Sequence, residues 1–105
     1  MGYTINSSEN KYNGWTNYAT WRVNLEIFDG YDLREPFPDD EAMRDFLTLH
    51  NVAEWAKTYA EEVISQDARG LAVDYALAFL ADVNWHEIAE HLIDYTNECA
   101  KVDAA

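Results

Sequence analysis

Apolar side chains recur in this chain at intervals of three and four residues, a spacing that places them on one face of an α-helix. The clearest stripe lies within residues 52–66, and another lies near the end of the chain. That second stripe consists of Trp85, Ile88, Ala89, Leu92, Tyr95 and Cys99. The pattern predicts helices over residues 17–28, 39–50, 52–66, 71–83 and 85–100.

Polar residues that favour helix ends flank these stripes. Ser, Thr, Asn and Asp cap helices because their side chains accept hydrogen bonds from the free amides of the first turn. Residues Asp39–Glu41 form an acidic first turn, which suits the positive end of a helix. The expected N-caps are Thr16 or Asn17, Asn51, and Asn84.

The first 15 residues are polar and contain several Asn, Ser and Gly, which predicts an irregular N-terminal arm. A short strand over residues 3–5 is an alternative. The β-branched and aromatic content of residues 17–28 leaves a strand interpretation open there as well. The remainder, residues 16–101, is expected to form the helical core.

Residues 71–83 are almost entirely apolar, and a helix that is apolar on all sides is usually buried. We therefore expect this helix to be central. Five helical segments in 105 residues predict a mainly α, compact single-domain bundle of about five helices. The aromatic residues expected in its core are Trp21, Trp55, Tyr59, Phe79 and Trp85.

Of the remaining features of the sequence, the excess of negative charge says most about what the protein could bind. The chain has 20 Asp and Glu against seven Lys and Arg, a net charge of −13. Residues 1–30 hold three acids and two bases, whereas residues 31–105 hold 17 acids and five bases. Such an excess repels nucleic acids and anionic membranes and attracts basic surfaces. Solubility is the alternative explanation, although it asks only for a magnitude of roughly 2–8 in a small domain.

The expected acidic surfaces lie on three helices. Within the last helix four acids are spaced three, four and four residues apart, so they share one face at intervals of about 4.5–6 Å along the axis. Simple solvation of exposed helix faces is the alternative. The candidate binding residues are Glu87, Glu90, Asp94 and Glu98, then Glu54, Glu61 and Glu62, and finally Asp39, Asp40, Glu41 and Asp45.

Motifs for catalysis or cofactor binding are weak in this sequence. His86 and His91 are five residues apart, so they lie roughly 140° apart around a helix and cannot share a zinc ion. Cys99 falls on an apolar stripe, and no phosphate-binding glycine loop occurs. The sequence therefore predicts a protein without catalytic residues, metal or cofactor. With no signal peptide pattern and no long apolar run, a cytoplasmic location is expected.

Residues 13–21 read N-G-W-T-N-Y-A-T-W, and this segment resembles the opening signature of a family of small proteins of phages, plasmids and prokaryotic genomes. The likeness continues at residues 70–72 and 83–92. The resemblance implies a mobile-element setting but no chemistry. The signature has a structural interpretation, as a helix cap with apolar residues behind it, and an alternative one as a recognition patch of Asn17, Tyr18 and Trp21.

Together these features predict an acidic mimic of DNA that inhibits a CRISPR or restriction complex by occupying its basic DNA-binding surface. Such a protein would bind neither nucleic acid nor membrane. A non-catalytic binding module whose acidity serves solubility is the alternative, and a small hydrolase-like enzyme is a third and less favoured hypothesis. The acidity suggests the mechanism, and the resemblance alone suggests the target.

Overall fold

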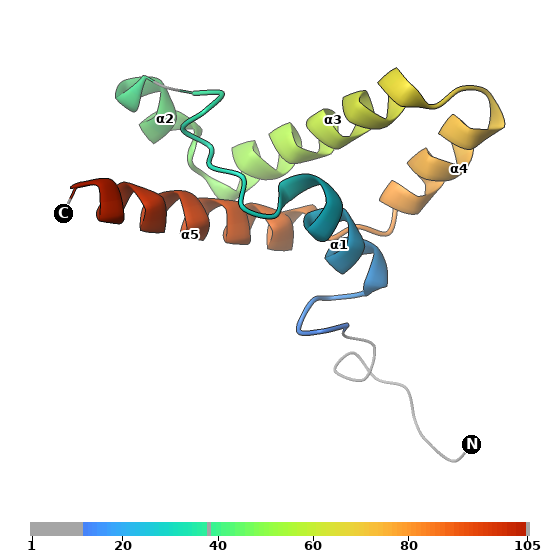
Figure 1. Cartoon of the computed structure of the whole chain (residues 1–105), viewed down its shortest axis with the longest axis horizontal. Coiled ribbons are helices and arrows are strands. Elements are labelled where there is room, and N and C mark those ends of the chain that lie inside the picture. Colours follow the sequence, from blue (N-terminus) through green and yellow to red (C-terminus); the bar gives the residue numbers. More distant parts are fainter. Residues whose placement is uncertain (1–11, 38, 105) are drawn as a thin grey trace, which may run out of the picture.

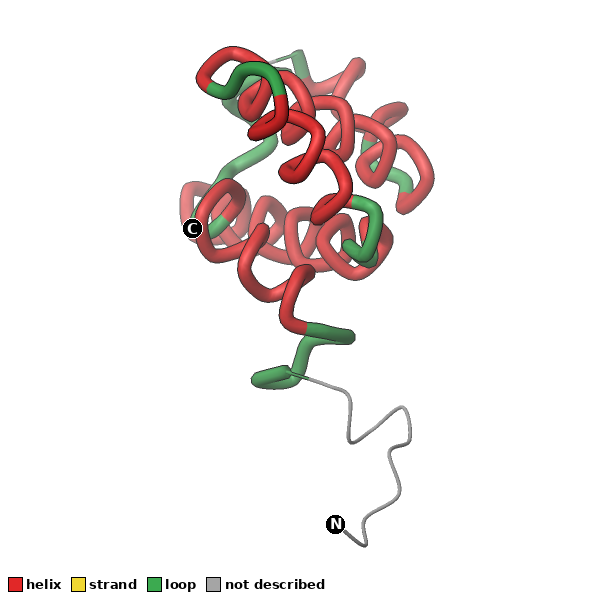
Figure 2. Tube along the Cα trace, turned by 90° about the vertical axis from the view of Figure 1, so that its right-hand side faces the viewer, coloured by secondary structure: helices red, strands yellow, loops and turns green. Residues whose placement is uncertain are grey.

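A computed structural model describes residues 12–37 and 39–104 (Figure 1). The described chain is mainly α, with α-helices joined by short loops and no strand in that part of the molecule (Figure 2). The strand considered over residues 3–5 lies outside the described residues. The elements are α1 (Tyr18–Val23), the π-helical turn η1 (Asn24–Phe28), α2 (Asp40–Phe46), α3 (Leu49–Asp67), α4 (Leu71–Leu80) and α5 (Trp85–Ala104).

The two longest helices, α3 and α5, pack side by side and form the centre of the molecule (Figure 1). Ala56 and Ala60 of α3 are completely buried, and their small side chains let the two helices approach closely. Ile88 and Leu92 of α5 lie in the same buried cluster. The mainly α bundle expected from the apolar stripes is confirmed.

The first helix is tied to the beginning of α5 by side chains from the opening signature. Asn17 caps α1 by accepting a hydrogen bond from the Thr20 amide at 2.9 Å, and it donates to the Asp82 carbonyl at 2.8 Å. The buried Thr20 hydroxyl accepts a hydrogen bond from the Asn84 amide at 2.9 Å. Two segments more than 60 residues apart are thereby joined, and the interpretation of the signature as a helix cap is confirmed for Asn17.

Asn84 stands at the middle of this junction. Its side-chain oxygen accepts a hydrogen bond from the Glu87 amide at 3.1 Å, which makes it the expected cap of α5. Its side-chain amide donates to the Thr16 hydroxyl at 2.9 Å. One residue therefore starts α5 and fixes the segment that leads into α1.

The boundary between α2 and α3 differs from the prediction. The helix expected to continue to His50 ends at Phe46, and α3 already begins at Leu49. Thr48, not Asn51, is the cap: its backbone is extended and its hydroxyl accepts a hydrogen bond from the Asn51 amide at 3.1 Å. The cap was predicted at Asn51, about one turn too late, because Thr48 and Asn51 both satisfy the capping preference.

The expectation that the apolar helix after Gly70 is central and buried is wrong. Leu80 is the single buried residue of α4, and Leu71 and Tyr75 are 63% and 69% exposed. Phe79, predicted as a core residue, is exposed as well. The helix lies at the edge of the molecule and contacts it along one face only, because α3 and α5 already bury each other (Figure 1).

A candidate acidic interface on α5 and the loop beside it

Three carboxylates of α5 form an exposed row. Glu90, Asp94 and Glu98 are spaced four residues apart, and all three are exposed. At about 100° per residue they lie opposite Leu92 and Thr96, the buried residues through which α5 faces the core. The spacing predicted from sequence is therefore realised on a helix that is fixed in place on its other side.

Glu87, the first member of the predicted row, has a different environment. It is half-buried, and its Oε1 atom accepts a hydrogen bond from the Thr16 amide at 2.8 Å. This contact is part of the junction between the opening signature and α5. Glu87 is thus held by the fold itself, and the freely exposed row begins at Glu90.

The loop between η1 and α2 is anchored beside this row. The Leu33 side chain is completely buried, and its amide donates a hydrogen bond to the hydroxyl of Thr96, which is itself 2% exposed. A buried amide without such a partner would cost about 1–3 kcal/mol. Residues on either side of Leu33 are consequently held against α5.

Arg34 connects that loop to the end of α5. Its guanidinium contacts Asp32 at 2.8 Å and Asp103 at 2.7 Å. The hydrogen bond from Arg34 is the main cause that lowers the pKa of Asp32, and it outweighs the opposing effect of burial. The same two carboxylates raise the pKa of Arg34. Asp32 is therefore ionised at neutral pH, and the triad links the loop to the end of α5.

Further carboxylates border the triad on both sides. Glu35 and Asp40 line one surface depression together with Asp32 and Arg34. Glu98 and Asp103 line another depression, to which Arg34 also contributes. Asp40 at the start of α2 and Glu98 at the end of the row therefore line two depressions that both include Arg34. Lys101 lies 3.7 Å from Glu98, with both side chains more than two-thirds exposed, so it offsets the charge of the row only weakly.

The other predicted acids do not join this surface as one group. Glu54 and Glu62 are exposed on α3, whereas Glu61 is half-buried. They lie on the side of α3 that faces away from its buried residues Ala56 and Ala60, and thus away from α5. In α2 all four predicted acids are exposed, and Asp39 also caps that helix by accepting a hydrogen bond from the Glu41 amide at 3.0 Å. These four are Asp39, Asp40, Glu41 and Asp45.

The alternative interpretation of residues 13–21 was a recognition patch of Asn17, Tyr18 and Trp21. These side chains are only partly free to contact a partner. Asn17 is occupied by its capping contacts. Tyr18 is 42% exposed and its ring packs edge-on against Tyr12 at 5.1 Å, while Trp21 lies 4.8 Å from Tyr12. Phe79 of α4 lies 6.3 Å from Tyr18 and continues this group of aromatic rings.

The prediction from sequence did not include a turn at the Asn-Gly pair that precedes α1. Asn13 and Gly14 both have positive φ, at 50° and 87°. Such a pair favours a tight two-residue hairpin turn. Tyr12 and Trp15 close this turn through two backbone hydrogen bonds of 2.8 Å. The turn lets the Trp15 ring stack on His91 at 4.0 Å, so His91 is engaged with an aromatic ring.

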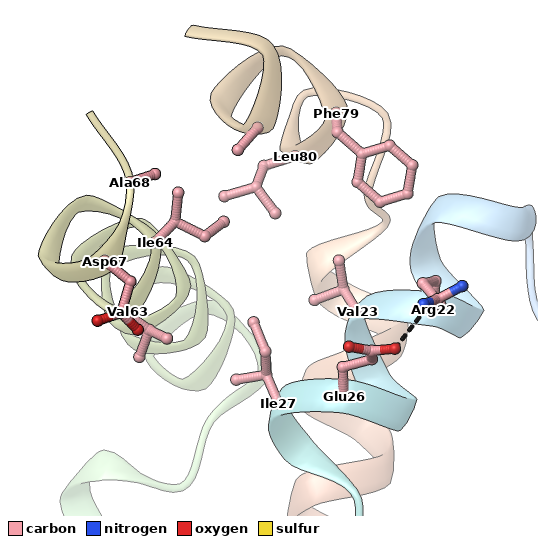
Figure 3. Close-up of a pocket in the computed structure, with 11 residues that line it drawn as sticks. Arg22, Val23, Glu26, Ile27, Val63, Ile64, Asp67, Ala68, Phe79 and Leu80 are labelled. Atoms are coloured by element: carbon pink, nitrogen blue, oxygen red, sulfur yellow. Dashed lines mark hydrogen bonds and ion pairs between the residues drawn. The ribbon is translucent and has the colours of Figure 1, made fainter. Parts of the chain in front are cut away.

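An apolar groove of about 560 Å³ lies between α1–η1, the end of α3 and α4 (Figure 3). Its floor is made of aliphatic residues, and Figure 3 shows the Arg22–Glu26 ion pair at one edge, with a separation of 2.6 Å. Asp67 lines the opposite side. The aliphatic lining includes Val23, Ile27, Val63, Ile64, Ala76 and Leu80.

No protein-family model, curated protein or solved structure matches this chain. The resemblance carried by residues 13–21 and 83–92 therefore stays a prediction. In the described part of the chain no three His, Cys, Asp or Glu side chains are grouped so that they could hold a metal ion. No described helix combines the length and apolar character needed to cross a membrane.

Proposed function

We propose that this protein is a non-catalytic inhibitor that mimics the charge of DNA and occupies a basic DNA-binding surface of a CRISPR or restriction complex. The observation that carries the proposal is the exposed row of Glu90, Asp94 and Glu98 on a helix whose opposite face is buried. A partner would meet this row without having to order it first, and such preorganisation favours binding.

The spacing of the row suits a surface that holds phosphates. Carboxylates four residues apart on a helix lie about 6 Å apart along its axis. Phosphates along one strand of DNA carry a charge at intervals of the same order. A basic cleft gains much of its affinity from neutralising those phosphates, and a carboxylate array can supply the matching charge.

The surroundings of the row extend its charge. Asp32, Asp40 and Asp103 lie around Arg34 at one end, so the acidic surface continues from α5 over the adjoining loop to α2. Like charges at this spacing disfavour the helix by a few tenths of a kcal/mol per pair. The arrangement is therefore slightly unfavourable for the isolated protein and becomes favourable once a cationic partner is bound.

The choice of target rests on the resemblance of residues 13–21 to proteins of mobile elements, whose hosts defend themselves with nucleases. In this proposal the protein acts in the host cytoplasm and binds neither DNA nor membrane. A binding module whose acidity serves only solubility would require no particular arrangement of carboxylates.

A competition assay tests the proposal. Purified guide-loaded CRISPR effector complexes and restriction endonucleases are titrated with the full chain, in the presence of a labelled DNA duplex that carries their target site. We expect the protein to displace the duplex from at least one of them and to do so less well as salt is raised. Binding that leaves the duplex in place, or that is insensitive to salt, would reject DNA mimicry.

A further inference from the structure

The apolar groove between α1–η1, the end of α3 and α4 is built jointly by three separate parts of the chain. Figure 3 shows Ile27, Ile64 and Leu80 pointing into the same open space, one from each of these parts. Its volume of about 560 Å³ lies within the range of roughly 300–1,000 Å³ that is common for ligand-binding clefts. Apolar side chains gathered around such a hollow mark a surface that a partner can cover.

Two carboxylates lie at the rim of this groove, on opposite sides. Glu26 lies on η1 and Asp67 lies at the end of α3 (Figure 3). Arg22 is the one base among the lining residues, and it is engaged with Glu26 at 2.6 Å and with the Tyr18 hydroxyl at 2.8 Å. The ion pairs between described residues do not include Asp67. With one base and two acids, the rim has a net negative charge and favours a cationic occupant.

A group of exposed aromatic rings adjoins the groove. Phe79 lines the groove and is 39% exposed, and its ring lies 6.3 Å from that of Tyr18, which is 42% exposed. Tyr12 and Trp21 contact Tyr18 in turn, with ring centroids 5.1 Å and 5.7 Å away. The faces of such rings attract Lys and Arg side chains, and Tyr and Trp often dominate the binding energy of protein interfaces. These four rings form an aromatic group that favours the same kind of occupant as the carboxylates.

From the apolar floor, the acidic rim and the aromatic group we infer that this groove binds a basic amphipathic helix of a partner protein. The apolar side chains of that helix, at positions i, i+3, i+4 and i+7, enter the groove, as in other helix-in-groove complexes. Its Lys and Arg side chains contact Asp67 and, across the groove, the aromatic group (Figure 3). A second copy of this chain is less suited, because two copies with a net charge of −13 repel each other.

This inference does not depend on the proposed function. None of the residues that line the groove belongs to α5 or to the loop that carries Asp32 and Arg34. Filling the groove should abolish helix binding and leave the DNA-mimicking surface intact, whereas neutralising the α5 carboxylates should do the reverse. Either proposal can therefore fail without the other.

Fluorescence anisotropy of three labelled peptides with the full chain tests the inference. Each peptide has about 14 residues, or about four helical turns. The first has Leu on one face and Lys on the other, the second is a scrambled sequence of the same composition, and the third has Glu in place of Lys. In about 0.15 M NaCl, which screens distant charges, the first should bind with a micromolar Kd and the others at least about ten-fold more weakly. Absent binding of the first peptide, or equal binding of either of the others, would overturn the inference.

Substitutions in the groove locate the contact. Ala76→Phe should weaken binding of the Leu–Lys peptide at least about ten-fold, because the added ring occupies space in the groove. Ala78→Phe adds the same ring to the exposed side of α4 and should leave binding unchanged. Circular dichroism confirms that both variants are folded. Peptide binding that Ala76→Phe does not weaken would place the site elsewhere.

Charge at the rim gives an independent readout through variants at exposed positions. Asp67→Lys should weaken binding of the Leu–Lys peptide and strengthen binding of the Leu–Glu peptide, each about three-fold. Asp74→Lys makes the same change on the side of α4 that faces away from the groove, and should alter neither. Equal effects of the two Lys variants would contradict the inference. Self-association of the free chain that Ala76→Phe abolishes, measured by sedimentation equilibrium, would assign the groove to a second copy instead.

Discussion

The carboxylate of Glu87 accepts a hydrogen bond from the backbone amide of Thr16 at 2.8 Å, across 71 positions of the sequence. This contact separates two carboxylates that look equivalent in the sequence. Glu87 holds the N-terminal segment against α5, whereas Glu90, one turn further along the same helix, is exposed. The first belongs to the fold and the second is available to a partner.

This difference predicts unequal effects on stability. Glu87→Ala should lower the free energy of unfolding by about 1–3 kcal/mol, because it leaves the Thr16 amide without its charged acceptor. Glu90→Ala removes the same side chain from an exposed position and should change stability by less than about 0.5 kcal/mol. Urea unfolding of both variants measures the difference. Equal losses would mean that the contact between Glu87 and Thr16 does not contribute.

The loop that carries Asp32 and Arg34 depends on Thr96. Thr96→Val should lower the free energy of unfolding by about 1–3 kcal/mol, since the buried Leu33 amide loses its acceptor. Thr58→Val, at an exposed position of α3, is the matched control and should have little effect. Urea unfolding compares the two, and a Thr96→Val protein as stable as its control would contradict this assignment.

Acid should remove the contribution of the Asp32–Arg34 pair. The pKa of Asp32 in the folded protein is lowered, mainly by its hydrogen bond to Arg34. The pair therefore stabilises the fold at pH values above about 4, the ordinary pKa of aspartate in an unfolded chain. That contribution declines as pH falls below 4 and through the folded pKa.

The measurement is the difference in unfolding free energy between the wild type and Asp32→Asn as a function of pH. Using the difference cancels the general effect of protonating the other carboxylates. It should be constant near neutral pH and shrink as the solution is acidified below about pH 4. A difference that grows under acid would reverse the sign of the proposed coupling.

The exposed row of Glu90, Asp94 and Glu98 should slightly lower the stability of the free protein, although the same carboxylates would bind the partner. Neutralising Glu90 and Asp94 together, as Glu90→Gln with Asp94→Asn, removes both like-charge pairs of the row, Glu90–Asp94 and Asp94–Glu98, and should raise the free energy of unfolding by a few tenths of a kcal/mol per pair at low salt. The gain should vanish at high salt. Thermal unfolding at two salt concentrations tests this, and a loss of stability would indicate that the row has a structural role.

The helical elements could be predicted from sequence because each depends on neighbours along the chain. The stripe of α5 and the capping by Asn17 and Asn84 are local patterns, and both caps are found where the sequence indicated. The stripe is buried at Ile88, Ala89 and Leu92, whereas Tyr95 is 43% exposed and the polar Thr96 is buried in its place. Thr48 and Asn51 satisfy the same local preference, so the sequence could not choose between them. The Asn13-Gly14 turn was also a local signal, and its identification required only the known preference of this pair.

What could not be predicted depends on contacts between distant segments. The apolar composition of α4 indicated burial, but only the packing of α3 on α5 determines that one side of α4 is left exposed. In the same way, nothing near Glu87 in the sequence shows that the Thr16 amide will reach it. The separation of the α3 carboxylates from those of α5 likewise follows from how the two helices face each other.

The most direct test of the proposed function compares these two acidic faces at equal charge. Glu90→Gln/Asp94→Asn/Glu98→Gln and Glu54→Gln/Glu61→Gln/Glu62→Gln each remove three negative charges, the first from α5 and the second from α3. Both are assayed as inhibitors of DNA cleavage by the complex that the wild-type protein inhibits. We predict that the α5 variant loses most of its inhibition and that the α3 variant retains it. Equal inhibition by both variants would contradict the claim that the α5 row is the DNA-mimicking surface.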